Sequence, residues 1–319
     1  MADHAWQSPC VQSPMSAVLA LAAKFAVLSR PILITGEPGT GKTLLARRIH
    51  ELSRRLGAFL SLHCRALALD TGMAELCGHT KGAFTGAMGD RKGLLETHHG
   101  GTLCLEEIGI ATAEVQEKLL QPLEDRNVRR LGEDRTRPLD VRMIATTNED
   151  LAAALVRGSF RADLLDRFGP FRLAVPPLRE RREEILPLAR YYLERAAAEC
   201  GRPVPRLMPD AIRALRAAPW PGNVRQLEQA CAYAVAMEEP GRPITAGSLP
   251  VWEDHAAPGR GRLTLEVARR LVGGEGGNLA RAARKSGWSE RQLRRVLAMG
   301  RGAGDGNSSN GSCDSSEAG

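Results

Sequence analysis

The chain has 319 residues, 43% of them hydrophobic and 25% charged, which is the composition of an ordinary globular protein with room for two or three domains. It contains neither an apolar run of the about 18 residues that a transmembrane helix requires nor a signal-peptide pattern, so we expect no membrane contact. Its seven cysteines are odd in number and include no C-x-x-C pair, which argues against a zinc site or a disulfide framework and indicates a cytoplasmic location.

The formal charge of +7 is concentrated near the C-terminus. Residues 260–301 contain eleven lysines and arginines but only three acidic residues. A basic C-terminal module is the electrostatic footprint expected of a protein that binds nucleic acid. A basic, solvated surface without a ligand remains the alternative interpretation of this segment.

The first folded segment is predicted to bind a nucleotide. After a loose leader (1–13), the apolar spacing predicts a helix over 14–29, a buried strand over 32–35 and an amphipathic helix over 44–56. A G-x4-G-K-T loop separates this strand from the second helix, which is the context in which backbone N–H groups bind phosphate oxygens. Its lysine is expected to reach the β- and γ-phosphates, and its threonine to ligate Mg²⁺. The loop consists of Gly36, Glu37, Pro38, Gly39, Thr40, Gly41, Lys42 and Thr43.

Two further strands are predicted to end in residues that act on the nucleotide. After a second strand at 59–64, an apolar strand over 101–108 contains Glu106 and Glu107 near its end. In P-loop ATPases an acid at this point organises Mg²⁺, and a base after it orients the attacking water. A fourth strand ends at Asn148, which suits contact with the γ-phosphate or with that water. A merely solvated strand end is the alternative for the two carboxylates. The segments around these strands are predicted as a helix (111–125), a charged loop (126–137) and the fourth strand itself (140–148).

A glycine-rich loop with charged flanks lies between the second strand and the acidic strand. It contains one aromatic and one hydroxyl side chain, Phe84 and Thr85, and its glycines permit unusual backbone dihedrals. This composition predicts a mobile contact tip, although an ordinary flexible turn has the same composition. The loop comprises Gly82, Ala83, Phe84, Thr85, Gly86 and Ala87.

The α/β domain is expected to span residues 14–177 and a helical lid residues 178–250. Arg161 and Arg167 lie near a helix end before the fifth strand (171–175), either as surface charges or as fingers that reach a neighbouring subunit's nucleotide. The lid is predicted to contain helices at 180–200, 209–217 and 223–238. Asn223 is expected to cap the last of these helices, and Arg225 to lie over the phosphates.

After a linker (251–262), residues 263–299 are predicted to form a small all-α helix-turn-helix domain. Asn278 and Ser289 are expected to cap its second and third helices, and a tail at 300–319 is expected to be disordered. A short helix, a turn with glycine and a basic helix are typical of this DNA-binding motif, although a small dimerisation unit is the alternative. The residues predicted to face DNA are Ser289, Arg291, Gln292, Arg294 and Arg295.

In this order, the motifs resemble those of the bacterial enhancer-binding activators of sigma-54 RNA polymerase, a branch of the AAA+ ATPases. The most specific is the loop GAFTGA (82–87), preceded by GHTK (78–81). The others are the strand motif GGTL-x-x-EIG and the segments PPLRERREEI (176–185) and PWPGNVRQLE (219–228). The resemblance covers residues 14–300 and implies an AAA+ P-loop parallel sheet with a helical lid, followed by a helix-turn-helix domain.

The resemblance also implies residue roles and an assembly. Glu107 is implied to be the catalytic base, Asn148 the first sensor and Arg225 the second sensor, with Arg161 and Arg167 as fingers acting in trans. A ring hexamer follows, since each active site needs a neighbour's arginine. Its loops would engage sigma-54 during ATP turnover, and its helix-turn-helix domains would bind DNA upstream of promoters.

Three positions depart from the family pattern. Glu106 stands where Asp is usual, His63 where an Asn restrains the catalytic Glu, and Thr43 where Glu is common. We expect hydrolysis to survive, at a reduced rate. A homo-hexamer or a mixed ring with a paralogue is expected. Because no sensory domain fits before residue 14, regulation is expected from the expression level, a trans-acting inhibitor protein or a partner activator. A hydrolysis-impaired DNA-binding regulator and a different AAA+ remodelling motor remain alternative functions.

Overall fold

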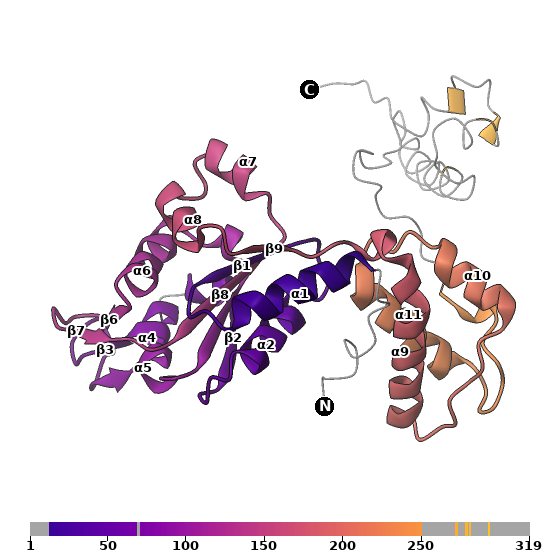
Figure 1. Cartoon of the computed structure of the whole chain (residues 1–319), viewed down its shortest axis with the longest axis horizontal. Coiled ribbons are helices and arrows are strands. Elements are labelled where there is room, and N and C mark those ends of the chain that lie inside the picture. Colours follow the sequence, from indigo (N-terminus) through magenta and orange to yellow (C-terminus); the bar gives the residue numbers. More distant parts are fainter. Residues whose placement is uncertain are drawn as a thin grey trace, which may run out of the picture. The chain divides into compact units, whose positions relative to one another are not determined.

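The computed structural model describes residues 13–68 and 71–250, together with six single positions between 272 and 293 (Figure 1). The chain divides into two units, residues 1–253 and 254–319. The leader before residue 13, the linker, the tail and nearly all of the predicted helix-turn-helix segment lie outside the described residues. Within the described residues, no helix is long and apolar enough to cross a membrane.

A five-stranded parallel sheet lies among the helices of the α/β part of the first unit (Figure 1). Its strand order is β2-β5-β8-β1-β9. All five predicted strands are confirmed. Parallel strands are covered on both faces, so they consist of short, nearly continuous apolar runs. The strands are β1 (Ile32–Thr35), β2 (Phe59–His63), β5 (Thr102–Glu106), β8 (Arg142–Thr147) and β9 (Arg172–Ala174).

Successive strand residues face two separate hydrophobic cores. Ile32 and Ile34 pack with α1 (Pro14–Ala26) and α2 (Lys42–Leu52) on one face, whereas Leu33 belongs to the core on the other. This alternation follows from the two-residue period of a strand. The helices that contribute to the second core are α3 (Cys64–Leu67), α4 (Gly72–Cys77), α5 (Leu94–Thr97), α6 (Ala113–Glu124), α7 (Leu151–Val156) and α8 (Ala162–Phe168).

The predicted lid is confirmed as a helical bundle with its own core. Trp220 and Leu227 are buried in it, and the Trp220 indole donates a hydrogen bond to the Leu215 carbonyl (2.8 Å). The bundle contains α9 (Ile185–Glu199), α10 (Pro209–Ala217) and α11 (Asn223–Met237). The first of these helices begins five residues later than predicted. Residues 178–184 instead contain two short 3-10 helices, Leu178–Glu180 and Arg182–Glu184. The side chains of Arg179 and of Arg181, which lies between these helices, reach the phosphate loop.

The charged segment 126–137 was predicted to be a loop, but it contains an antiparallel hairpin. Its strands are β6 (Asn127–Arg129) and β7 (Thr136–Pro138). Charged, mostly exposed residues conceal these strands in the sequence, because short exposed strands carry no apolar alternation. The hairpin contacts the base of the glycine-rich loop through β3 (Gly78–His79), which pairs with β4 (Arg91–Lys92).

Candidate nucleotide site and its lid

The predicted phosphate loop lies between β1 and the N-terminus of α2. Gly39 and Gly41 have φ angles of 77° and 100°, a backbone conformation that glycine adopts at little cost. The Lys42 ammonium donates hydrogen bonds to the carbonyls of Gly36 (2.9 Å) and Glu37 (3.3 Å). Burial lowers the pKa of Lys42, and nearby Glu107 opposes that shift. The loop thus presents a partly desolvated cation beside a helix N-terminus, an arrangement suited to phosphate.

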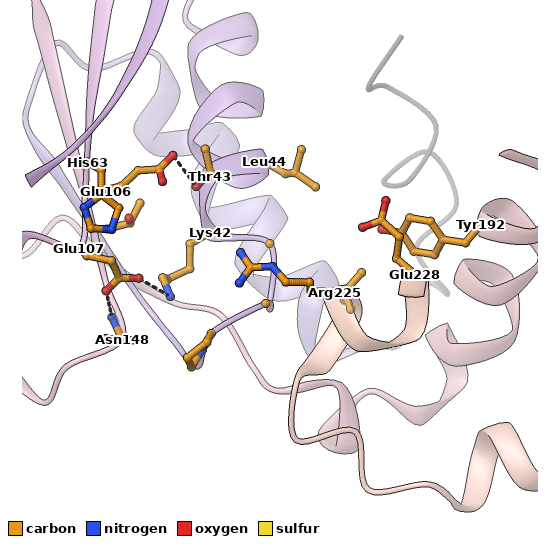
Figure 2. Close-up of a pocket in the computed structure, with 15 residues that line it drawn as sticks. Lys42, Thr43, Leu44, His63, Glu106, Glu107, Asn148, Tyr192, Arg225 and Glu228 are labelled. Carbon is orange, nitrogen blue, oxygen red and sulfur yellow. Dashed lines mark hydrogen bonds and ion pairs between the residues drawn. The ribbon is translucent and has the colours of Figure 1, made fainter. Parts of the chain in front are cut away.

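The two carboxylates predicted at the end of β5 have different partners. Glu106 Oε1 accepts hydrogen bonds from the Thr43 hydroxyl (3.1 Å) and from the Ser61 hydroxyl. Glu107 lies 3.4 Å from the Lys42 ammonium, and its Oε2 accepts a hydrogen bond from the backbone N–H of Asn148 (2.9 Å) (Figure 2). The structure therefore brings together the residues predicted for the metal, the base and the first sensor.

Glu107 has a left-handed backbone conformation, with φ 54° and ψ 55°. This conformation is unfavourable for a residue with a Cβ atom and is concentrated at functional sites. It ends the regular strand at Glu106, which is why the strand is shorter than predicted. The turn directs the side chains of Glu106 and Glu107 to different partners in the same cavity.

A cavity of about 430 Å³ connects these residues to the lid. Its size is within the usual range for small-molecule sites. It contains cationic groups from Lys42 and Arg225 and anionic groups from Glu106 and Glu107, which suits a polyanion bound together with a divalent cation. Its lining residues are Pro38, Gly39, Gly41, Lys42, Thr43, Leu44, His63, Glu106, Glu107, Thr146, Asn148, Tyr192, Val224, Arg225 and Glu228.

The oxygen atoms near the phosphate loop fit Mg²⁺. A hydrogen bond of 3.1 Å holds the Thr43 hydroxyl beside the Glu106 carboxylate, and both groups supply hard oxygen ligands of the kind this ion prefers. Among the described residues, no cluster of three or more His, Cys, Asp or Glu side chains forms a metal cage. Mg²⁺ in nucleotide sites typically has few protein ligands and completes its coordination with phosphates and water.

The lid contacts the phosphate loop directly through the start of α11. The amides of Val224 and Arg225 donate hydrogen bonds to the Gly39 carbonyl (3.0 and 3.3 Å). In Figure 2, the Arg225 guanidinium points from α11 toward Lys42. Arg225 thus lines the same cavity as the phosphate loop, and its predicted place over the phosphates stays a prediction.

Asn223 was predicted to cap α11, and this prediction is wrong. Gly222 is the residue before the helix, and no side chain caps it. The buried Asn223 side chain instead accepts a hydrogen bond from the Leu178 amide (2.8 Å) and donates to Glu37 Oε2 (3.1 Å) and the Pro38 carbonyl (3.0 Å). Sequence reasoning missed this role because the partners are far apart in the chain. The signal present was an Asn after Pro-Gly, because Asn tolerates the left-handed conformation (φ 53°) found here.

His63 lines the cavity but does not restrain Glu107. Its Nδ1 atom accepts a hydrogen bond from the Arg65 amide (3.2 Å), which caps α3. Glu107 is held by Lys42 and the Asn148 amide instead.

Arg161 and Arg167 do not line this cavity. The Arg161 guanidinium is paired with Asp163 and the Arg167 guanidinium with Glu124, each at 2.7 Å. Both arginines are more than a third exposed. Their predicted role in a neighbouring subunit's site stays a prediction.

The glycine-rich loop forms a compact turn. Hydrogen bonds connect the Gly82 amide to the Ala87 carbonyl and the Ala87 amide to the Phe84 carbonyl, each 3.0 Å long. The Phe84 ring is 36% exposed and lies edge-on against His79, with 5.0 Å between ring centroids. Sequence reasoning missed two supports of this loop: the Thr80 amide donates to the Leu131 carbonyl, and Gly132 packs against Ala83.

The predicted DNA-facing residues (Ser289, Arg291, Gln292, Arg294 and Arg295) lie outside the described residues. At one described position of this segment, the Arg281 amide donates to Asn278 Oδ1 (3.0 Å), the contact expected of the predicted cap.

The fold, the phosphate loop and the paired carboxylates define a P-loop ATPase with an AAA+ lid. Family profiles agree: the "Sigma-54 interaction domain" profile matches residues 10–174, and the "AAA+ ATPase lid domain" profile matches residues 179–260. The chain therefore belongs to the family of sigma-54-dependent enhancer-binding activators, as its motifs predicted.

Individual relatives support this membership. The chain is 42% identical over 228 residues to the Nif-specific regulatory protein of Herbaspirillum seropedicae, covering 71% of this chain and 42% of that protein. It is 44% identical over 229 residues to the regulatory protein AtoC of Escherichia coli K12, covering 72% and 50%. Thus it spans about half the length of these curated relatives. GlrR of the same strain is 38% identical over 307 residues, covering 92% and 68%.

Crystal structures of NtrX from Brucella abortus are similar in fold. The structure of NtrX with ATP has a TM-score of 0.67 at 30% identity, covering 89% of this chain and 67% of that one. The structure with ADP has a TM-score of 0.68 at 29% identity, covering 89% and 68%.

Proposed function

We propose that the protein is a sigma-54-dependent transcriptional activator that hydrolyses ATP to remodel the closed complex of sigma-54 RNA polymerase on promoter DNA. One observation carries this proposal: two stretches of the chain connect the GAFTGA loop and its supporting hairpin to the strands that carry the catalytic residues. The loop leads through β4 and α5 into β5, which ends at Glu106. The hairpin that supports the loop leads through β7 into β8, which precedes Asn148.

The residues of the cavity account for hydrolysis. The phosphate-loop amides and Lys42 bind the phosphates, while Thr43 and Glu106 would hold Mg²⁺, which supplies charge neutralisation when it is bound. Glu107 accepts a proton from the water that attacks the γ-phosphorus, as the bond from phosphorus to the ADP oxygen breaks. Lys42 lies 3.4 Å from Glu107, so phosphates that attract Lys42 would weaken its hold on this base.

The protein's assembly and its DNA contact belong to the same proposal. Arg161 and Arg167 would complete a neighbour's site in a ring hexamer, either of one chain or mixed with a paralogue. Residues 263–299 would bind double-stranded DNA upstream of the promoter and keep the ring near its polymerase. The basic composition of that segment supports the DNA contact.

Truncating the loop's aromatic side chain tests the proposed function. Phe84→Ala should abolish binding to sigma-54 in the presence of an ATP transition-state analogue, while ATPase activity is largely retained. Leu56→Ala, which removes another exposed apolar side chain far from the loop in the chain, is the control and should behave like the wild type. If Phe84→Ala bound sigma-54 normally, or instead lost only coupling to DNA, the protein would be a different AAA+ motor.

A hydrolysis-impaired regulator is the second candidate, favoured by Glu106 and by the absence of a contact from His63 to Glu107 among the described residues. Release of phosphate by the purified wild type separates the two. Glu107→Gln keeps the phosphate loop intact but lacks the base, so it should bind ATP without turnover and supplies the background rate. A wild type no faster than this variant would establish the impaired regulator.

A further inference from the structure

The phosphate loop has two chemically distinct faces, and the lid occupies one of them. Its carbonyls at residues 38–40 accept hydrogen bonds from the segment that joins the sheet to the lid and from the start of α11. Asn223 Nδ2 donates to Pro38, the Val224 and Arg225 amides donate to Gly39, and the Arg181 guanidinium donates to Thr40 (2.9 Å). The approach is close: a Cβ atom on Gly39 would lie 2.3 Å from the Gly222 carbonyl oxygen.

The side chain of Glu37 extends this contact. Its two carboxylate oxygens accept a bidentate pair of hydrogen bonds from Arg179 (2.6 and 2.8 Å), and Asn223 donates to one of them (3.1 Å). The hydrogen bonds from Arg179 lower the pKa of Glu37, with a smaller contribution from Asn223. A phosphate-loop acid that does not line the nucleotide cavity thus serves as an attachment point for the lid.

Asn223 connects these contacts. Its side chain uses both functional groups, because the carbonyl accepts from the Leu178 amide and the amide group donates to Glu37 and Pro38. It is completely buried, and its backbone has the left-handed conformation (φ 53°) that Asn adopts more readily than most residues. Arg225, whose guanidinium lines the nucleotide cavity, follows two residues later.

We propose that Asn223 is a positioning residue that fixes Arg225 relative to the phosphates by attaching the lid to the outer face of the phosphate loop. The inference rests on the proposed nucleotide function and assigns how the lid is coupled to it. The loop's peptide groups bind phosphate through their N–H groups, while their carbonyls bind the lid. Hydrogen bonds in such chains polarise one another, so nucleotide binding and lid attachment strengthen each other reciprocally.

A double-mutant cycle tests this role. Asn223→Gly removes the side chain but retains a residue that adopts the left-handed backbone. We expect it to weaken ATP binding about tenfold, the equivalent of one hydrogen bond to a charged group. Because Asn223 acts through Arg225, Arg225→Ala should weaken binding strongly alone but add little in the Asn223→Gly background. Fully additive effects, or wild-type affinity in Asn223→Gly, would overturn the proposal.

Glu37→Gln provides a second test on the surface, where folding is not at risk. Removing a negative charge near a phosphate site should by itself tighten ATP binding, whereas loss of the lid attachment should weaken it. The proposal requires weaker binding, about threefold, the equivalent of one weakened hydrogen bond. Unchanged or tighter binding overturns it.

Arg242→Ala, which breaks an exposed lid ion pair with Glu239 (2.8 Å), is the control and should leave affinity unchanged. All measurements are equilibrium titrations with ATP on the full chain, so they require neither sigma-54 nor hydrolysis. A wild type that bound no ATP would refute the proposed function itself, whereas normal ATP binding in Asn223→Gly would refute only the role of Asn223.

Discussion

The Thr43 hydroxyl donates a hydrogen bond to Glu106 Oε1 across 3.1 Å, which joins the phosphate loop to the end of β5. Ser61 on β2 donates to the same oxygen. Two hydroxyls thus fix one oxygen of a carboxylate that is one methylene longer than the family's usual Asp. They leave Oε2 without a hydrogen bond among the described residues, available for a metal ion. The short Thr43 and the long Glu106 are therefore complementary departures from the family pattern.

The first prediction concerns Ser61 as a support for this carboxylate. Ser61→Ala should raise the Mg²⁺ concentration for half-maximal ATPase activity about three- to tenfold, because Glu106 gains rotamer freedom when one hydrogen bond is lost. Titration of Mg²⁺ into the ATP complex should show the same shift, while ATP binding without Mg²⁺ stays unchanged. Ser61→Thr, which keeps the hydroxyl, should restore the wild-type value. An unchanged Mg²⁺ dependence in Ser61→Ala would contradict this role.

A second prediction concerns the hairpin that supports the GAFTGA loop. A Cβ atom on Gly132 would lie 2.8 Å from the Ala83 Cβ atom, so Gly132→Ala should displace the loop and reduce sigma-54 binding. Gly158 is a matched control because its φ of 70° is close to the 77° of Gly132, whereas its Cβ would have open space.

Both substitutions should cost about 1 kcal/mol of unfolding free energy from the backbone alone, measured by urea denaturation. Only Gly132→Ala should affect sigma-54 binding. Equal sigma-54 binding by the two variants would show that the hairpin does not position the loop.

The sheet and the phosphate loop were predictable because their signals are local. Each central strand is an apolar run between turn residues, and the loop is a contiguous motif beside its strand and helix. The hairpin at 127–138 has no such signal, since its strands are three residues long and largely polar. The role of Asn223 was missed for a related reason: its position before a helix suggests a cap, but one of its partners, Glu37, is 186 residues away in the chain. Local propensity does not report a contact of that kind.

The third prediction concerns an ion pair that supports the same hairpin. Arg130 donates two hydrogen bonds to Glu96 on α5 (2.6 and 2.7 Å), and the two side chains are only 11% and 12% exposed. These hydrogen bonds lower the pKa of Glu96. A depressed folded-state pKa means that the stabilisation is present above the unfolded pKa and is lost as pH falls through the folded value.

Glu96→Gln should therefore be about 2 kcal/mol less stable than the wild type at pH 7, the scale of a hydrogen bond to a charged group. The difference should shrink on acidification below the ordinary pKa of about 4.3 for Glu. Urea denaturation at pH 7 and pH 3 measures both values. A destabilisation that persists undiminished at pH 3 would show that packing, rather than charge, sets the effect.

The last prediction concerns the two arginines that this chain does not bring to its own cavity. Arg161→Ala and Lys42→Ala should each abolish ATPase activity in a uniform ring, the first for lack of a finger and the second for lack of phosphate binding. In a randomly mixed ring, a site works when its own phosphate loop is intact and its neighbour supplies the arginine. Each condition holds for half of the subunits, so co-expression in equal amounts should restore about a quarter of the wild-type rate.

Mixing Arg167→Ala with Lys42→Ala in the same way shows whether one or both arginines act in trans. Arg48→Ala is the matched control, because Arg48 is 44% exposed, like Arg161, and is likewise ion-paired with a nearby acid, Glu51. That variant should retain full activity without mixing. If neither arginine variant recovers activity with Lys42→Ala, the fingers do not act between subunits. An arginine that can be replaced without loss has no catalytic role, and its ion pair with Asp163 or Glu124 is then its function.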